Sequence, residues 1–297
     1  MSCTEQNEKL EYAKKCLEAF SAKMNERAKE YGMTHTHFND ASGVNNSSCT
    51  SDIMKLLMNA YPYAKKYKIW GLEEHTLKTE GVDPREVYAY SKTLRSVAFG
   101  DVSKFYDIKL GKGGTLITPK IYNSALIVSV PGREDTDEYL ACVAMGGDEY
   151  YDQPKNVYAA AKSAIDEAMK KFKGEESEEG YVCAKSAQVY HVDAEGKKTL
   201  LYEKDPDFVI APASTSKIMT YILACEYLPD FEARLTVTQE VFECLPRIFY
   251  QSYLKVGDSV RIYDLIALLM LMSSNLTGYV LAAAIGDIIL KSEESNR

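Results

Sequence analysis

The chain has 297 residues, a hydrophobic fraction of 46% and a formal net charge of −8. This length and apolar fraction are typical of a globular protein with one large or two modest domains, able to bury a core without structural metals or disulfides. The acidic balance and the lack of a Lys/Arg cluster argue against nucleic acid as a partner, because binding its phosphate backbone needs many cationic contacts.

The cysteines and the most apolar segments indicate which classes of protein the chain does not belong to. The seven cysteines are an odd number without a C-x-x-C pair, so we expect neither a disulfide framework nor a zinc knuckle, but mostly buried small side chains. The N-terminus lacks the basic and apolar regions of a signal peptide, and the most apolar run, residues 265–272, is too short to span a bilayer. We therefore expect a soluble chain without an export signal or a membrane segment.

The first half of the chain changes from helix to strand. Hydrophobic periodicity predicts a long helix over residues 7–31, a polar loop over 36–51 and a second helix over 52–67. From about Val97 to Met145 the pattern is that of strands. Within this region "NSALIVSV" and "EYLACVAM" are separated by "PGREDTD", whose composition is typical of a hairpin connection, so the two runs are predicted to be adjacent antiparallel strands.

A polar linker is predicted early in the second half of the chain. Residues 152–173 form a helical pattern with Asp152 as N-cap, Pro154 in the first turn and lysines at the end, stopping at Gly174. The following "GEESEEG", residues 174–180, has no apolar residue and is typical of a solvated linker.

After this linker the sequence predicts two strands and then helices. Residues 181–193 and 197–205 are predicted to be two strands around Ala194-Glu195-Gly196. "YDLIALLMLMSS", residues 263–274, is apolar on nearly all faces and predicts a central core helix.

A hydroxyl and an amine one helical turn apart are the first chemical signal. In "APASTSKIMTYILACEYL", residues 211–228, Ser214 precedes Lys217 by three positions at the start of a predicted helix, so the two side chains can touch. A serine needs a nearby base to become a nucleophile, and a buried lysine with a lowered pKa can supply one. Helix N–H groups can stabilise an oxyanion. The pattern alone also fits an N-cap serine beside a solvated lysine.

Three segments together resemble one enzyme family. "QVYHVDAEGKKTLLYEKDPDFVIAPASTSKIMTYILACEYL" is similar to the nucleophile segment of the penicillin-binding D-alanyl-D-alanine carboxypeptidases and the hairpin before it. "LLMLMSSNLTGYVLAAAIG" resembles their Ser-x-Asn element, with Ser273 and Asn275, although Ser274 stands where glycine is usual. "YDIKLGKGGTLITP" resembles their Lys-Thr-Gly element, with Lys112-Gly113-Gly114 at the motif.

The order of these elements differs from that of the family. The chain runs Lys112, Ser214, Ser273, and "MNERAKEYGMTHTHFNDASGV", which resembles the family segment following Ser-x-Asn, stands at residues 24–44. Reading residues 181–297 and then 1–174 restores the family order. The resemblance therefore implies a circularly permuted single catalytic domain, 1–297, in which residues 174–180 join the old ends. The implied fold is α+β, of the serine β-lactamase and transpeptidase type, with an antiparallel sheet flanked by helices and a helical lobe.

The resemblance also implies a role for each matching residue. Ser214 is the expected acylated nucleophile and Lys217 its general base. Ser273 is expected to relay a proton to the leaving amine, Lys112 to hold Ser273 and attract a carboxylate, and Asn275 to hydrogen-bond the substrate. Taken separately, Ser273 and Asn275 also fit a polar cluster that ends a helix.

The third element is expected to bind substrate, with one departure. Gly113, Gly114 and Thr115 are implied substrate-binding residues, with the N–H groups of Thr115 and Ser214 forming the oxyanion hole. Gly113 stands where the family has threonine, so the threonine hydroxyl is missing from the motif. Outside the resemblance, Gly111 to Gly114 also fit a simple turn.

The expected activity is hydrolysis of peptides ending in D-Ala-D-Ala through an acyl-serine, with peptidoglycan stem peptides or β-lactams as ligands. The family works outside the cytoplasmic membrane, so an extracytoplasmic location is implied. One alternative is a β-lactamase or esterase of the same superfamily; "EHTLK", from Glu74, lacks the asparagine of a class A deacylation element. The other is a binding or sensing module without turnover, which Gly113 favours.

No cofactor or metal is expected. "GKGGT" lacks the spacing of a phosphate-binding loop. His35 and His37 are two possible ligands without a third in view, so we expect strand or loop histidines there.

Overall fold

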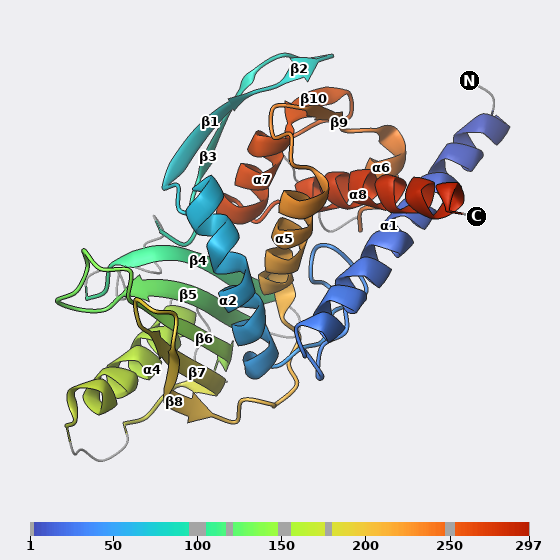
Figure 1. Cartoon of the computed structure of the whole chain (residues 1–297). Helices are drawn as coiled ribbons and strands as arrows, with labels where there is room; N and C mark the ends of the chain where they lie inside the picture. The colour runs from blue at the N-terminus through green and yellow to red at the C-terminus, as the bar shows by residue number, and fades with distance from the viewer. Residues whose placement is uncertain are drawn as a thin grey trace.

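The computed structural model describes residues 3–94, 105–116, 121–147, 156–175, 180–246 and 253–296. In chain order the elements are α1 (Cys3–Glu30), α2 (Thr50–Tyr67), β1 (Glu74–Lys78), β2 (Glu80–Gly81), β3 (Glu86–Tyr90), β4 (Ile108–Leu116), β5 (Ile121–Ser129), β6 (Tyr139–Gly147), α4 (Asn156–Lys173), β7 (Ala184–Val192), β8 (Lys198–Lys204), η2 (Ala213–Ser216), α5 (Lys217–Tyr227), β9 (Arg234–Thr236), α6 (Gln239–Glu243), β10 (Asp258–Arg261), α7 (Ile262–Leu271) and α8 (Asn275–Ser295). The fold is mixed, with antiparallel sheets and helices, as expected (Figure 1).

A five-stranded antiparallel sheet in the order β4-β5-β6-β7-β8 divides the core in two. Side chains of a strand alternate between its faces, and on β5 Ala125 and Ile127 join the core shared with the helical lobe. Leu126 and Val128 join the core on the opposite face. The predicted hairpin of residues 123–145 is confirmed, because β5 pairs with β6. The hairpin around Ala194-Glu195-Gly196 is also confirmed, as β7 pairs with β8.

Helices cover both faces of this sheet. α2 packs against β5, β6 and β7 on one face, and α4 packs on the other (Figure 1). α4 ends at Gly174 as predicted: this glycine has a φ of 70°, and its N–H donates to the carbonyl of Lys171. The predicted N-cap Asp152, Pro154 and residues 176–179 of the expected linker lie outside the described residues.

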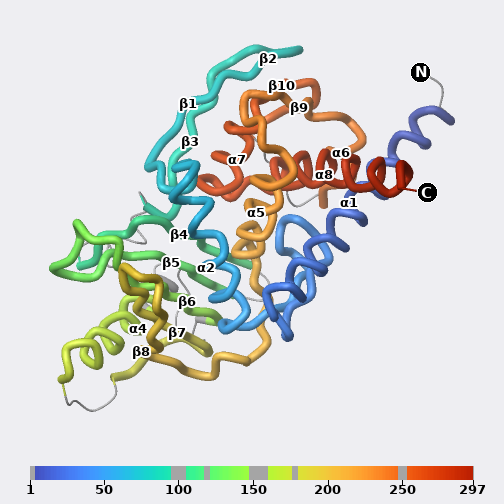
Figure 2. Tube along the Cα trace, in the orientation of Figure 1, coloured from blue at the N-terminus to red at the C-terminus, as the bar shows by residue number. Residues whose placement is uncertain are grey.

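The helical lobe consists of α1, α5, α6, α7 and α8. The predicted core helix is confirmed as α7, whose residues are buried except Tyr263. α8 packs across α1: a Cβ at Gly286 would overlap the carbonyl of Cys16, and Tyr12 donates to Asp287 at 2.8 Å. The first turns of α1 and the last turns of α8 lie on the same side of the lobe (Figure 2).

A hairpin of β1 and β3 lies where the sequence analysis placed no strand. β1 pairs with β3, and β2 pairs with β10. The hairpin buries few side chains, chiefly Leu77, Val87 and Ala89, so its hydrophobic pattern is weak. It includes "EHTLK", whose Glu74 is exposed.

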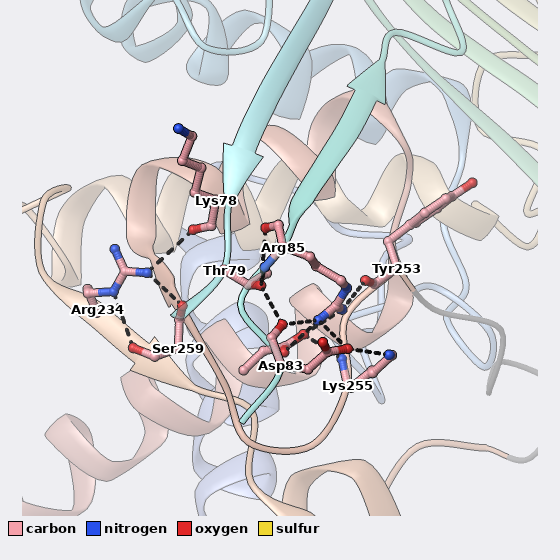
Figure 3. Close-up of polar contacts among 9 residues, drawn as sticks. Lys78, Thr79, Asp83, Arg85, Arg234, Tyr253, Lys255 and Ser259 are labelled. Atoms are coloured by element: carbon pink, nitrogen blue, oxygen red, sulfur yellow. Dashed lines mark hydrogen bonds and ion pairs between the residues drawn. The ribbon is translucent and has the colours of Figure 1, made fainter. Parts of the chain in front are cut away.

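Charge pairs attach the tip of this hairpin to the lobe. Arg85 donates from both terminal nitrogens to the buried carboxylate of Asp258, at 2.9 and 2.8 Å. Arg234 donates to the carbonyl of Lys78 at 3.4 Å (Figure 3) and forms an ion pair with Glu80 at 3.2 Å. A bidentate Arg–carboxylate pair holds a fixed geometry.

The cysteines agree with expectation, since the six with described side chains are free and five of them are buried. In the described part of the chain, no helix has the length and hydropathy needed to cross a bilayer.

The packing of α8 predicts that alanine substitutions at two of its glycines have opposite effects on the free energy of unfolding. Gly286→Ala places a methyl group against the backbone of Cys16, and we expect a loss of unfolding free energy of roughly 1–3 kcal/mol, as for other overpacked sites. The matched control is Gly278→Ala, whose Cβ would have ordinary neighbours at 3.4 and 3.5 Å and would gain helix propensity. Urea unfolding measures both, and equal destabilisation would contradict this packing.

Candidate active site

The segment carrying Ser214 is held against the edge strand β4. After β8 the chain reaches η2, where Ser214 lies one turn before α5. Asn123 on β5 donates to the carbonyl of Ala211 at 2.9 Å and accepts from the N–H of Gly146 at 3.0 Å. A Cβ at Gly114 would lie 2.6 Å from the carbonyl oxygen of Pro212, so only glycine lets β4 approach η2 this closely.

The amine nitrogen of Lys217 lies at the centre of the site. Its Nζ is 2.9 Å from Ser214 Oγ, 2.8 Å from the carbonyl oxygen of Ser42 and 2.7 Å from Asn275 Oδ1. These three partners come from η2, from the loop between α1 and α2, and from the first residue of α8. The side chain is fully buried.

This environment favours the neutral amine. Burial lowers the pKa of Lys217 to about 7; the negative charge of Asp40 opposes this shift and the positive charge of Lys92 adds to it. A neutral amine has two N–H bonds and one lone pair. The Ser42 carbonyl and the Asn275 amide oxygen can only accept, so they take the two N–H bonds and leave the lone pair for the hydroxyl proton of Ser214.

A second buried lysine holds Ser273. Lys112 Nζ on β4 is 2.9 Å from Ser273 Oγ, although the two residues are 161 positions apart, and it donates to the carbonyl of Gly113 at 2.8 Å. Burial and the positive charges of Lys217 and Lys92 lower the pKa of Lys112 well below its usual value. The expected convergence of Lys112, Ser214 and Ser273 is therefore present.

The turn between α7 and α8 positions Ser273 and Asn275. Ser274 is the N-cap of α8 and accepts from the N–H of Thr277 at 3.3 Å, which accounts for a serine where the family usually has glycine. Ser273 has a φ of 59° and Ala213, beside the nucleophile, a φ of 50°. Left-handed backbone is strained for both residue types, and such strain is concentrated at functional sites.

A pocket of about 250 Å³ opens at these side chains. Ser214, Ser273, Asn275 and Lys112 line it. Gly113 and Thr115 line it as well, whereas Gly114 lies behind it against Pro212. The described lining residues include no carboxylate, imidazole or thiol, and their charged groups are lysines, so the pocket is suited to an anionic ligand.

Lys92 is a pocket residue that sequence reasoning missed. Its backbone N–H donates to the carbonyl of Leu271 at 3.0 Å, at the end of α7, and the neighbouring Thr93 lies where a Cβ of Gly111 would be. Although the side chain as a whole is exposed, the surrounding protein lowers the pKa of its ammonium group. No motif marks this lysine, because only the tertiary contacts place it between β4 and α7.

The loop carrying Ser42 belongs to the segment that resembles the family, but its sequence alone does not predict that Ser42 reaches Lys217. The carboxylate of Asp40 accepts from the N–H groups of Ser42 and Gly43 at 2.6 and 2.7 Å, which folds the loop and directs the Ser42 carbonyl to Lys217. A Cβ at Gly43 would overlap the carbonyl of Ala213, so the loop touches the nucleophile turn. The Asp-x-Ser-Gly pattern is a turn signal that could have indicated this fold.

Comparisons with known proteins agree with this geometry. Residues 174–289, which include Ser214, Lys217, Ser273 and Asn275, match the family model of the D-alanyl-D-alanine carboxypeptidases. Neither the curated proteins nor the solved structures gave a match. The part of the chain that carries these four residues is therefore similar to the D-alanyl-D-alanine carboxypeptidases.

Proposed function

We propose that the chain removes the terminal D-alanine from peptides ending in D-Ala-D-Ala, with Ser214 as the acylated residue. The observation that carries this proposal is the environment of Lys217, whose two fixed acceptors leave its lone pair for Ser214. The family match supports the same reaction.

Acylation follows from this geometry. Ser214 Oγ attacks the carbonyl carbon of the scissile peptide bond, and its proton passes to Lys217 Nζ. The negative charge on the carbonyl oxygen is stabilised by the N–H groups of Ser214 and Thr115, which line the same pocket. Asn275 lies at the pocket wall, where it can hydrogen-bond the peptide.

The leaving group needs a proton, and Ser273 is placed to supply it. Ser273 Oγ donates its proton to the departing amine of D-alanine and recovers one through the hydrogen bond to Lys112. The C–N bond breaks and the acyl-serine remains. Lys217 then gives up the proton taken during acylation to solvent, and Lys112 regains one from solvent. Water attacks the ester, Lys217 takes one proton from that water and passes it to Ser214 Oγ as the ester C–O bond breaks, and the peptide acid leaves and ionises to a carboxylate.

The charge of the pocket supports a substrate with a free carboxylate. Lys92 and Lys112 both line it, and a protonated amine on either of them favours a terminal carboxylate over a neutral end. Peptidoglycan stem peptides and β-lactams both present a carboxylate beside a reactive carbonyl. We propose these as the ligands, and an extracytoplasmic location at the cell wall.

We also propose that the chain is one catalytic domain with a permuted order. The family match begins at Gly174, where the expected linker begins, and the residues before it supply Lys112. α4 connects β6 to β7 within one sheet, so the two sequence halves share a single sheet. The last turns of α8 and the first turns of α1 lie on one side of the lobe, as joined family helices would (Figure 2).

The first prediction concerns the nucleophile. A β-lactam adds covalently to Ser214, and intact-mass analysis shows one adduct that disappears in Ser214→Ala. The matched control is Ser216→Ala, because the Ser216 hydroxyl is buried without a hydrogen-bond partner among the described residues and is not part of the mechanism. An adduct on Ser214→Ala would refute the assignment of the nucleophile.

A second prediction concerns pH. The neutral amine of Lys217 is the base, so the second-order acylation rate rises with pH around a midpoint of about 7. Lys92→Met removes a positive charge that lowers the pKa of Lys217, so the midpoint moves to higher pH and the rate at neutral pH falls. Lys92→Arg keeps the charge and the midpoint. Stopped-flow acylation across the neutral range measures all three proteins, and an unmoved midpoint in Lys92→Met would exclude this coupling.

A third prediction concerns Gly113. A threonine hydroxyl at this position would add a hydrogen bond to the substrate carboxylate, worth roughly 1.5–3 kcal/mol, or about ten- to a hundred-fold in rate or affinity. We expect weak turnover by the native chain and a gain of about tenfold in kcat/KM for Gly113→Thr. Gly114→Ala provides the contrast, because its Cβ would lie 2.6 Å from the Pro212 oxygen and should lower acylation. The measurement is the rate of D-alanine release from a D-Ala-D-Ala peptide. If a folded Gly113→Thr variant shows no gain in kcat/KM, the substrate carboxylate does not bind at position 113.

A further inference from the structure

Three potential metal ligands meet outside the pocket. The side chains of His35, Cys49 and Asp207 each bring a ligand atom to within 4.8 Å of the other two, and His35 Nδ1 is 3.9 Å from Asp207 Oδ1. The sequence offered only the pair His35 and His37. The structure supplies the other ligands from the start of α2 and from the segment after β8. None of the three lines the catalytic pocket.

We propose that His35, Cys49 and Asp207 form a structural Zn²⁺ site. Imidazole nitrogen, thiolate and carboxylate together suit zinc, whereas Mg²⁺ and Ca²⁺ prefer oxygen ligands. A tetrahedral zinc ion with bonds of about 2.0–2.3 Å separates its ligands by roughly 3.3–3.8 Å, so distances within the cluster need to contract by at most about 1.5 Å. The fourth position is open to water.

The surrounding contacts hold the ligands in place. Ser51 Oγ donates to Asp207 Oδ1 at 2.6 Å and lies 3.2 Å from Cys49 Sγ, so one hydroxyl bridges two of the ligands. The N–H of His35 donates to the buried Asp52 at 2.8 Å. Hydrogen-bond partners such as Ser51 and Asp52 orient the ligand residues and so increase the affinity for the metal. The hydroxyl of Thr34, 3.2 Å from His35 Nδ1, is exposed and must rotate away when this nitrogen binds zinc.

Exposure makes the site accessible. The side chains of His35 and Asp207 are 42% and 63% exposed, while Cys49 is buried beneath them. An ion can enter from solvent and reach the sulfur at the inner side of the cluster.

Bound zinc would connect the two segments that form the catalytic centre. His35 begins the loop that presents Ser42 to Lys217, and Asp207 precedes the nucleophile turn. Backbone hydrogen bonds between Ser48 and Ile210 already join these segments, at 3.0 and 2.7 Å. A metal cross-link beside this bridge would stabilise the fold without taking part in the chemistry.

Spectroscopy of the full chain tests the site directly. The protein is treated with chelator and titrated with Co²⁺, and we expect one ion per chain with a thiolate-to-cobalt charge-transfer band, displaced by Zn²⁺. Zn²⁺ raises the Tm, because a ligand of the native state stabilises it. Mg²⁺ gives neither signal.

Variants separate this site from adventitious binding. Cys49→Ser abolishes the band yet should fold, because serine is a favourable N-cap for α2. His35→Gln and Asp207→Asn weaken Zn²⁺ binding by at least about tenfold, and Ser51→Ala by about tenfold or more through lost orientation. The matched control His37→Gln changes an exposed histidine two positions away and leaves affinity unchanged. The absence of a thiolate band, wild-type zinc affinity in Cys49→Ser, or equal losses in His35→Gln and His37→Gln would each overturn the proposal.

Discussion

The burial of an amine at Lys217 is the constraint on which the site depends. An isolated buried charge is costly, so the lysine shifts towards its neutral form, and its N–H bonds still need acceptors. The Ser42 carbonyl and Asn275 provide them, at 2.8 and 2.7 Å. The loop after α1, the start of α8 and the nucleophile turn must all meet at one atom, which fixes how the lobe packs on the sheet.

Close backbone contacts make this meeting possible. Gly43 and Gly114 both touch the nucleophile turn: a Cβ at Gly43 would meet the backbone of Ala213, and one at Gly114 the backbone of Pro212. The left-handed backbone of Ala213 and Ser273 is unfavourable, so the surrounding packing must hold it. α7, buried along almost its whole length, ends directly before Ser273 and gives that turn a rigid support.

The clustering of Lys92, Lys112 and Lys217 bears on two properties of the site: the reactivity of Ser214 and the preference for an anionic substrate. Burial lowers the pKa of both Lys112 and Lys217; the charges of Lys217 and Lys92 lower that of Lys112 further, and the charge of Lys92 lowers that of Lys217. The same field attracts a carboxylate. In the proposed mechanism one arrangement therefore activates the serine and favours an anionic substrate. Lys92 contributes to it from the end of a hairpin whose tip is anchored by Arg85 and Asp258.

The sequence determined the elements whose signals are local. The Ser214–Lys217 spacing, the apolar helix α7 and the two predicted hairpins follow from periodicities of three to four or two residues, which a continuous stretch displays. The resemblance added Lys112, Ser273 and Asn275, because motifs keep their identity even when their order changes. The hydrophobic pattern of the β1–β3 hairpin is too weak to predict its strands. Only the tertiary structure decided that the Ser42 carbonyl and Lys92 reach the site, and that Cys49 and Asp207 meet His35. These contacts join residues distant in sequence, where backbone packing rather than local pattern sets which groups become neighbours.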